Sequence, residues 1–194
     1  MIVDDDSESG VLGTLLFQAL RLYSVEALHA IVFDENPLVR TAVARELQVR
    51  GDVSTYELMS RSSFDIREYV REISAFTLGQ LGTPERPFRE QSIPLLVALA
   101  TDDCVDVRAA AVSSLGHSRA NEAVDAIVKA GGDLSPEVRA SAATALGRVS
   151  RSNEVITALQ NLYHDAEQDV REWAGLSLEL QGVALDDEID SNRR

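Results

Sequence analysis

Charged residues that could form ion pairs recur along this chain at a constant spacing. Each of five arginines has valine directly before it, aspartate six residues before it and leucine seven residues after it: Arg40, Arg71, Arg108, Arg139 and Arg171. The matching aspartates are Asp34, Asp65, Asp102, Asp133 and Asp165. A guanidinium presents a fork of donors that matches a carboxylate, so the first chemistry to expect is Arg–Asp pairing. Because the frame occurs five times, at intervals of 31, 37, 31 and 32 residues, we expect a structural ladder in a repeat protein.

Residue types that usually carry catalysis or bind metals are few and scattered. The three histidines, His29, His117 and His164, lie far apart in the sequence, and none is followed by glutamate, whereas a catalytic metal site takes about three protein ligands. Cys104 has no neighbouring His or Lys to activate a thiolate. Phosphate-binding glycine motifs and a GxSxG elbow are absent. We therefore expect no catalytic residue, no metal and no cofactor, and we predict that the protein is not an enzyme.

The arginine frame has to lie near the start of a helix. Pro37 and Pro136 both stand three residues before their arginines, and proline is favoured in the first turn, where its missing amide would be unpaired anyway. On a helical wheel the valine, the +3, +4 and +7 residues and the arginine stem share one face. Glycines follow eight and eleven residues after several arginines and are interpreted as chain reversals at helix ends: Gly79, Gly116 and Gly147, then Gly51, Gly82 and Gly182.

The predicted fold class is all-α, a solenoid of about five antiparallel helix pairs over residues 11–182. An extra amphipathic helix over residues 11–22 would cap the N-terminal end of the array, after an acidic segment over residues 1–10. An insertion over residues 83–90, with Pro84 and Pro87, explains the 37-residue interval. A polar tail is expected over residues 183–194. The repeats are predicted over residues 24–51, 53–82, 91–118, 120–150 and 152–182.

Three segments carry a resemblance to a known family: residues 102–116 (DDCVDVRAAAVSSLG), 133–147 (DLSPEVRASAATALG) and 165–178 (DAEQDVREWAGLSL). They resemble HEAT repeats, in particular the short variety found in phycobilisome-lyase-like proteins. The resemblance implies an α-solenoid that presents a binding surface. The sequence lacks the His-Glu pairs of the HEAT-repeat lysine hydroxylase and any obvious pigment-binding signature.

The chain is strongly acidic, with 18 basic residues against 32 acidic ones and a net charge of −14. Non-specific nucleic-acid binding needs Lys and Arg to neutralise phosphates, so we expect no nucleic-acid partner. A basic protein partner would be attracted instead, although the acidity could serve solubility alone. No run approaches the roughly 18–20 apolar residues of a membrane span, and the N-terminus has no basic signal-peptide region. With one cysteine, a cytoplasmic location is expected.

Partner-binding residues are predicted on the second helices, which line the concave face in such solenoids. The −2, +2 and +5 positions point away from the apolar stripe. All three hold large apolar groups in the second repeat, as do +2 and +5 in the fifth, where a solvated face would be polar. The +1 position adds a glutamate in both repeats. Interface hot spots are enriched in Tyr and Trp. The predicted residues are Tyr69, Glu72, Ile73, Phe76, Asp106, Glu137, Asp169, Glu172, Trp173 and Leu176. The alternative is that the insertion covers Tyr69, Ile73 and Phe76, and that the C-terminal segment covers Trp173.

A second resemblance bears on function. Residues 31–51 (IVFDENPLVRTAVARELQVRG), 70–82 (VREISAFTLGQLG) and 169–179 (DVREWAGLSLE) are similar to HEAT-repeat immunity proteins encoded beside Rhs-type polymorphic toxins of bacteria. The resemblance implies a protein that binds and neutralises a toxin domain, such as a basic nuclease, through its acidic concave face. An intracellular adaptor or regulatory scaffold stays open as an alternative. So does a lyase-like accessory protein that binds a tetrapyrrole.

Overall fold

The computed structural model describes residues 15–16 and 18–184, and within these ranges it contains helices and no strand. In chain order the elements are α2 (Val25–His29), α3 (Pro37–Arg50), α4 (Val53–Ser62), α5 (Glu68–Leu78), α6 (Arg89–Leu99), α7 (Val105–His117), the 3₁₀ turn η1 (Asn121–Ala123), α8 (Val124–Ala130), α9 (Pro136–Leu146), α10 (Asn153–Tyr163) and α11 (Gln168–Leu180). The all-α prediction is confirmed.

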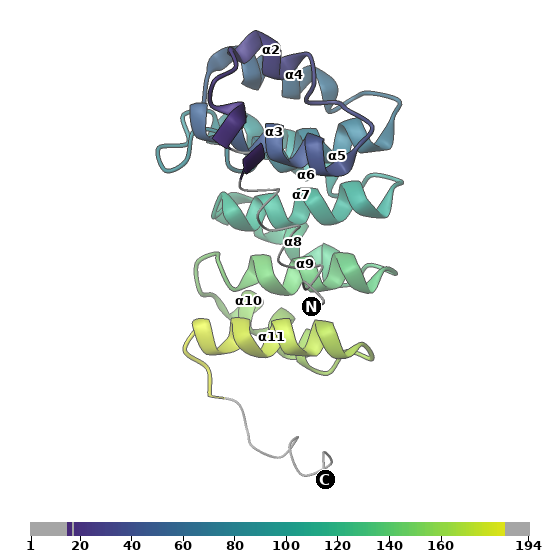
Figure 1. Cartoon of the computed structure of the whole chain (residues 1–194). Coiled ribbons are helices and arrows are strands. Elements are labelled where there is room, and N and C mark those ends of the chain that lie inside the picture. Colours follow the sequence, from purple (N-terminus) through teal and green to yellow (C-terminus); the bar gives the residue numbers. More distant parts are fainter. Residues whose placement is uncertain (1–14, 17, 185–194) are drawn as a thin grey trace, which may run out of the picture.

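The helices form two layers (Figure 1). Helices α3, α5, α7, α9 and α11 stack side by side in one layer, here called the second-helix layer, and each contacts the next. The first helices of the pairs, α2, α4, α6, α8 and α10, form the first-helix layer, which packs against the second-helix layer. Each first helix also contacts the second helix of its own pair. This arrangement is the predicted α-solenoid of helix pairs.

The starts of the second helices follow from the local sequence. Pro37 and Pro136 are the first residues of α3 and α9, as predicted. Asn36 precedes α3, and its side chain accepts a hydrogen bond from the Leu38 amide at 3.0 Å. This bond satisfies one of the amides that lack a partner inside the helix.

The predicted apolar stripe is the core. The leucine seven residues after each arginine is at most 3% exposed: Leu47, Leu78, Leu115, Leu146 and Leu178. The valine before the arginine is fully buried in four repeats: Val70, Val107, Val138 and Val170. Val39, in the first pair, is half-buried. The stripe therefore joins neighbouring repeats into one continuous apolar core.

Two sets of glycines serve different purposes, which corrects part of the prediction. Gly51, Gly82 and Gly182 have φ angles of 61°, 71° and 72°, so they are the left-handed chain reversals that were expected. Of the glycines eight residues after the arginines, Gly79 and Gly147 do end helices, as the C-caps of α5 and α9, but they are not left-handed reversals, and this set lies where adjacent second helices approach closely. A Cβ atom on Gly116 would stand 2.6 Å from the Cα atom of Ala145, and one on Gly79 would stand 2.4 Å from the Cβ atom of Ser114.

We predict that Gly116→Ala lowers the free energy of unfolding by about 2 kcal/mol, because the added methyl group meets backbone that cannot move aside. The gain in helix propensity, roughly 1 kcal/mol, offsets only part of this loss. Gly132→Ala is the matched control, since the nearest atom to its Cβ position is the Lys129 carbonyl oxygen at 3.6 Å. Urea denaturation checks the pair, and equal stability of the two variants would contradict close approach as the reason for Gly116.

The N-terminal helical segment and the insertion are each held to the helix pairs by specific side-chain contacts. In the predicted N-terminal helix, residues 15, 16 and 18–20 are helical, whereas residues 11–14 and 17 lie outside the described part of the chain. Residues 1–10 and 185–194 also lie outside it. Arg50, at the end of α3, donates to the carbonyls of Leu20 and Tyr23. At the end of the insertion, Phe88 stacks on Tyr56 of α4, with ring centroids 4.8 Å apart.

Candidate functional site

The recurring arginines form the predicted ladder, and its rungs join neighbouring repeats. Arg71 binds both carboxylate oxygens of Asp102 at 2.7 Å, Arg108 binds those of Asp133 at 2.8 and 3.0 Å, and Arg139 those of Asp165 at 2.7 and 2.8 Å. In all five repeats the arginine Nη1 atom also donates to the carbonyls six and five residues before it, at 2.7 to 3.2 Å. We call the three bidentate pairs the Asp–Arg ladder. It holds each second helix to the turn of the next repeat, which is a structural role.

The Asp–Arg ladder lowers the pKa of its carboxylates. Hydrogen bonds from Arg108 hold the pKa of Asp133 below its usual value, and bonds from Arg139 do the same for Asp165. For Asp102 burial acts in the opposite direction, but the bonds from Arg71 and from the Cys104 amide still lower the pKa. These carboxylates therefore stay ionised in the folded protein at pH values where an unfolded chain begins to bind protons.

We predict that the ladder loses its stabilising effect in acid. Because the folded pKa of Asp133 lies below the unfolded value of 3.8, its contribution is complete above that value and disappears as the pH falls through the folded pKa. Asp133→Asn should be less stable than the wild type at pH 7, and the two should converge towards pH 2. Urea denaturation at pH 7, 4 and 2 measures this difference. A gap that stays constant with pH would contradict the ionic contribution.

The first rung differs from the others. Arg40 lies over the ring of Tyr69, 5.0 Å from its centroid, while Arg67 lies 5.7 Å from the same ring. Asp65, which holds the ladder position, instead pairs with Arg67 at 2.9 Å. Tyr69 is half-buried, and both guanidinium groups lie within cation–π distance of its ring. It is therefore already engaged within the chain.

Part of the apolar set predicted to face outward in the second repeat is core. Ile73 was placed on the outward side of the helical wheel, but it is only 4% exposed, so this prediction is wrong. Its helix α5 contacts both α3 and α7, and a wheel of one helix does not show how far two neighbours cover its flanks. Phe76 is half-buried against the same core. Neither residue offers a large free apolar surface.

Acidic side chains of the second-helix layer lie close enough to affect one another. Burial raises the pKa of Glu72, Arg40 opposes the shift, and the negative charges of Asp106 and Glu137 raise it further. These three residues come from α5, α7 and α9. Asp169 continues the series on α11 and is exposed. The structure thus brings the predicted acids together as a stripe across successive helices, here called the acidic stripe.

The acidic stripe leads into a groove between α9 and α11. One hollow, of about 480 Å³, is lined by Ser113, Pro136, Glu137, Ala140, Ser141, Thr144, Glu167, Asp169, Val170 and Trp173. A second, of about 400 Å³, is lined by Thr144, Arg148, Trp173, Leu176, Ser177, Glu179 and Leu180. The two hollows share Thr144 and Trp173, and together we call them the Trp173 groove. Trp173 is 46% exposed and Leu176 51%.

The Trp173 groove unites four of the predicted residues, Glu137, Asp169, Trp173 and Leu176. The remaining predicted acid of α11, Glu172, is exposed and accepts a hydrogen bond from Gln168 at 2.7 Å. Sequence reasoning missed Glu167, Arg148 and Leu180 as lining residues. Their only signal is their position beside the ends of α9 and α11, because the groove is formed between two repeats and not by the face of one helix.

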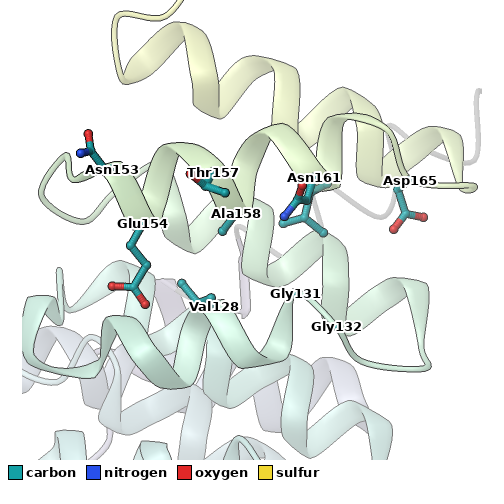
Figure 2. Close-up of a pocket in the computed structure, with 10 residues that line it drawn as sticks. Val128, Gly131, Gly132, Asn153, Glu154, Thr157, Ala158, Asn161 and Asp165 are labelled. Atoms are coloured by element: carbon teal, nitrogen blue, oxygen red, sulfur yellow. The ribbon is translucent and has the colours of Figure 1, made fainter.

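A separate hollow of about 580 Å³ lies in the first-helix layer, between α8 and α10. Figure 2 shows Asn153, Glu154, Thr157, Ala158 and Asn161 along α10, with Val128 on the neighbouring helix. Asp165, at the rim, already binds Arg139 of the ladder. None of the predicted partner-binding residues lines this hollow.

The scattered histidines have ordinary roles within the fold. His29 Nε2 lies 2.8 Å from the Thr55 hydroxyl, the His117 ring bonds the Ser113 carbonyl, and His164 lies against Tyr163. Within residues 15–16 and 18–184 no group of three His, Cys, Asp or Glu side chains could hold a metal ion. Among the helices described, none has both the length and the apolar character that crossing a bilayer requires.

The similarity of this chain to known proteins lies in its repeats. The family model for HEAT repeats matches residues 56–130 and residues 93–179. Protein YibA of Escherichia coli strain K12 is 27% identical over 172 residues, which cover 85% of this chain and 61% of YibA. This chain therefore spans less than two thirds of the length of that relative. The X-ray structure of Escherichia coli YibA superimposes with a TM-score of 0.79 at 24% identity, covering 98% of this chain and 68% of the other.

Two further solved structures share the fold at low identity. One is the complex of CpcE and CpcF of phycocyanin lyase from Nostoc, with a TM-score of 0.52, 22% identity, and coverage of 72% of this chain and 86% of the other. The other is a designed armadillo repeat protein in complex with the peptide (KR)4, with a TM-score of 0.59, 18% identity, and coverage of 92% and 95%. These likenesses establish the fold alone.

Proposed function

The chain belongs to the HEAT-repeat family, and from that premise we propose that it is a non-catalytic protein-binding scaffold for a basic partner. The Trp173 groove carries the proposal. A large aromatic side chain that is 46% exposed and lies between two adjoining hollows offers the kind of contact that dominates binding energy in protein interfaces. A partner would gain most by inserting an apolar side chain beside Trp173.

Charge supports a basic partner. Glu137, Glu167 and Asp169 line the groove on one side of Trp173, and the acidic stripe continues to Asp106 and Glu72. Burial raises the pKa of Glu72, and the negative charges of Asp106 and Glu137 raise it further, so cationic groups of a partner would relieve a repulsion already present. The related solenoid that holds the (KR)4 peptide is a precedent for such a ligand on this type of fold.

For the identity of the partner we propose a toxin domain of the Rhs-type polymorphic systems, which this chain would bind and neutralise in the cytoplasm. The resemblance of residues 31–51, 70–82 and 169–179 to HEAT-repeat immunity proteins supports this choice. A basic nuclease domain has the charge that the acidic stripe requires. An adaptor with another basic partner would use the same groove, so the two possibilities differ in the partner and not in the surface.

The test is capture of partners from the native organism with the full chain as bait. Wild type is compared with Trp173→Ala and with Leu134→Ala, whose side chain is 98% exposed in the turn before α9. One stoichiometric basic protein that is retained by wild type and Leu134→Ala and lost by Trp173→Ala supports the proposal. Equal retention by all three contradicts it, and a bait that gains a visible absorbance band instead would favour the tetrapyrrole alternative.

We predict that association with the basic partner slows as salt rises. Attraction between exposed charges is screened over roughly 8–10 Å at 0.10–0.15 M salt, and electrostatic steering acts mainly on the association rate. Glu137→Gln combined with Asp169→Asn should reduce the association rate and flatten its salt dependence. Stopped-flow or surface-based kinetics at 50 and 500 mM salt provide the measurement. An association rate that is independent of salt would remove the electrostatic part of the proposal.

A further inference from the structure

The two hollows of the Trp173 groove differ in their charge. The hollow of about 480 Å³, here called the acidic hollow, has no basic residue of the described chain in its lining but three acids: Glu137, Glu167 and Asp169. The hollow of about 400 Å³, here called the apolar hollow, is lined by two leucines and by one charge of each sign: Leu176, Leu180, Arg148 and Glu179. A ligand that fills both hollows therefore needs a cationic group in one and an apolar group in the other.

The acids of the acidic hollow are available to a ligand. Glu137, Glu167 and Asp169 are exposed, and none of them forms an ion pair with another described residue. Asp133 and Asp165, by contrast, are already bound by the Asp–Arg ladder. The first turns of α9 and α11 contain Glu137 and Asp169, and the helix dipole stabilises a negative charge there. The fold therefore tolerates these acids without an internal cation.

Trp173 lines both hollows and can contact both groups of such a ligand. It is 46% exposed, and among aromatic rings the face of an indole attracts Lys and Arg most strongly. Its remaining surface is available to an aliphatic side chain in the apolar hollow. In α9 the same position of the frame holds Ser141, so the aromatic junction between the hollows is a feature of the fifth helix pair.

The distance between the hollows limits the shape of the ligand. On α9 the acidic hollow is lined by residues between 136 and 144, and the apolar hollow by residues 144 and 148. On α11 the corresponding residues lie between 169 and 173 and between 173 and 180. The centres of the two sets are about six residues apart on each helix, which is roughly 9 Å along the axis at 1.5 Å per residue.

One backbone conformation places two side chains on the same face at this separation. In polyproline II, residues i and i+3 are one full turn apart, or about 9.3 Å. In a β-strand, residues i and i+3 are about 10 Å apart but point to opposite faces. In an α-helix, residues on one face are about 6 Å apart at i+4 or about 10.5 Å apart at i+7. The hollows therefore fit an extended segment in the polyproline II conformation best.

We propose that the Trp173 groove binds a linear segment of the partner in which a Lys or Arg and an aliphatic residue are three positions apart, in the polyproline II conformation. The cation enters the acidic hollow against Trp173, and the aliphatic side chain enters the apolar hollow. This inference rests on the proposed function, a basic protein partner, and adds the form and the pattern of the segment recognised. Polyproline II leaves its backbone groups unpaired, and Ser113 and Ser141 of the acidic hollow offer hydroxyls to them.

The test reads the fluorescence of Trp173, the only tryptophan of the sequence, so it needs no captured partner. The full chain is titrated with acetyl-Gly-Arg-Pro-Pro-Leu-Gly-amide, a peptide without aromatic residues that favours polyproline II. The same peptide with Arg and Leu exchanged is also titrated, because the hollows define the spacing and not the chain direction. At least one order should give a saturable change in emission. The isomer acetyl-Gly-Arg-Leu-Pro-Pro-Gly-amide, which fills one hollow at a time, should bind more weakly by about tenfold or more.

Matched substitutions in the peptide and in the protein test the charge. Replacing the arginine of the peptide by glutamine should weaken binding by about tenfold. Glu137→Gln combined with Asp169→Asn should weaken the arginine peptide equally and leave the glutamine peptide unchanged, whereas Leu180→Ala should weaken both. Glu154→Gln, at an exposed acid of α10 that does not line the groove, is the control and should bind both peptides as wild type does.

The inference is overturned if the spaced and adjacent isomers bind equally, if arginine and glutamine peptides bind equally, or if no peptide changes the emission of Trp173. Such results differ from a failure of the proposed function, which partner capture measures. A basic protein that is retained by wild type and lost by Trp173→Ala, without any peptide response, would keep the proposed function and show that the partner binds through a folded surface. The expected peptide pattern supports the segment even when no partner is captured.

Discussion

Replacing Arg108 by alanine is expected to lower the free energy of unfolding by about 2 to 3 kcal/mol. The change removes both bonds to Asp133 and those to the carbonyls of Asp102 and Asp103. It leaves Asp133, whose side chain is 15% exposed, without its cation. Breaking a fully buried pair costs more, about 3 to 5 kcal/mol, and the remaining contact with water accounts for the smaller value expected here. Urea denaturation at pH 7 measures the loss.

Arg67→Ala is the matched control for Arg108→Ala. Arg67 also pairs with an aspartate, Asp65, but within one turn and with half of its side chain exposed. We therefore expect little change in its unfolding midpoint. The structural assignment of the ladder would be wrong if Arg108→Ala kept the wild-type melting temperature and lost partner binding, because the arginine would then act at the interface.

Replacing Trp173 by alanine is expected to raise the dissociation rate of the partner by about 30-fold or more, which corresponds to the 2 kcal/mol that defines an interface hot spot. Trp173 borders both hollows of the Trp173 groove. Its replacement by alanine therefore enlarges the groove and removes the largest apolar side chain that a partner could contact there. Because Trp173 is 46% exposed, so that only about half of it is buried, the free energy of unfolding should fall by only about 1 to 2 kcal/mol.

The dissociation rate of Trp173→Ala has to be compared with the stability of the variant and with a substitution at a second exposed residue. Dissociation is measured with the partner captured by wild type, and thermal unfolding of each variant is recorded in parallel. Leu134→Ala should leave both quantities unchanged. A Trp173→Ala variant that binds like wild type would place the interface elsewhere, whereas one that loses about 3 kcal/mol or more of unfolding free energy would show that Trp173 acts mainly as a core residue.

The candidate site was predictable in part. A repeated local frame identified the second helices, and the acids Glu137 and Asp169 with the apolar residues Trp173 and Leu176 were expected to point outward. All four line the groove that the structure contains. Ile73 occupies the same position of the frame as Trp173, yet it is 4% exposed. The difference arises because α5 has second helices on both sides, so equal positions on two helical wheels meet different neighbours.

By itself the sequence determined the features that depend on one helix and its turn. Pro37 and Pro136 begin helices, Gly51 reverses the chain, and the leucines seven residues after the arginines are buried, because these outcomes follow from local backbone geometry and from the helical period. Only the tertiary structure decided which aspartate each arginine binds, why Gly116 must lack a side chain, and where Trp173 meets open space. Those outcomes depend on the offset and distance between stacked helices, which no single period along the chain contains.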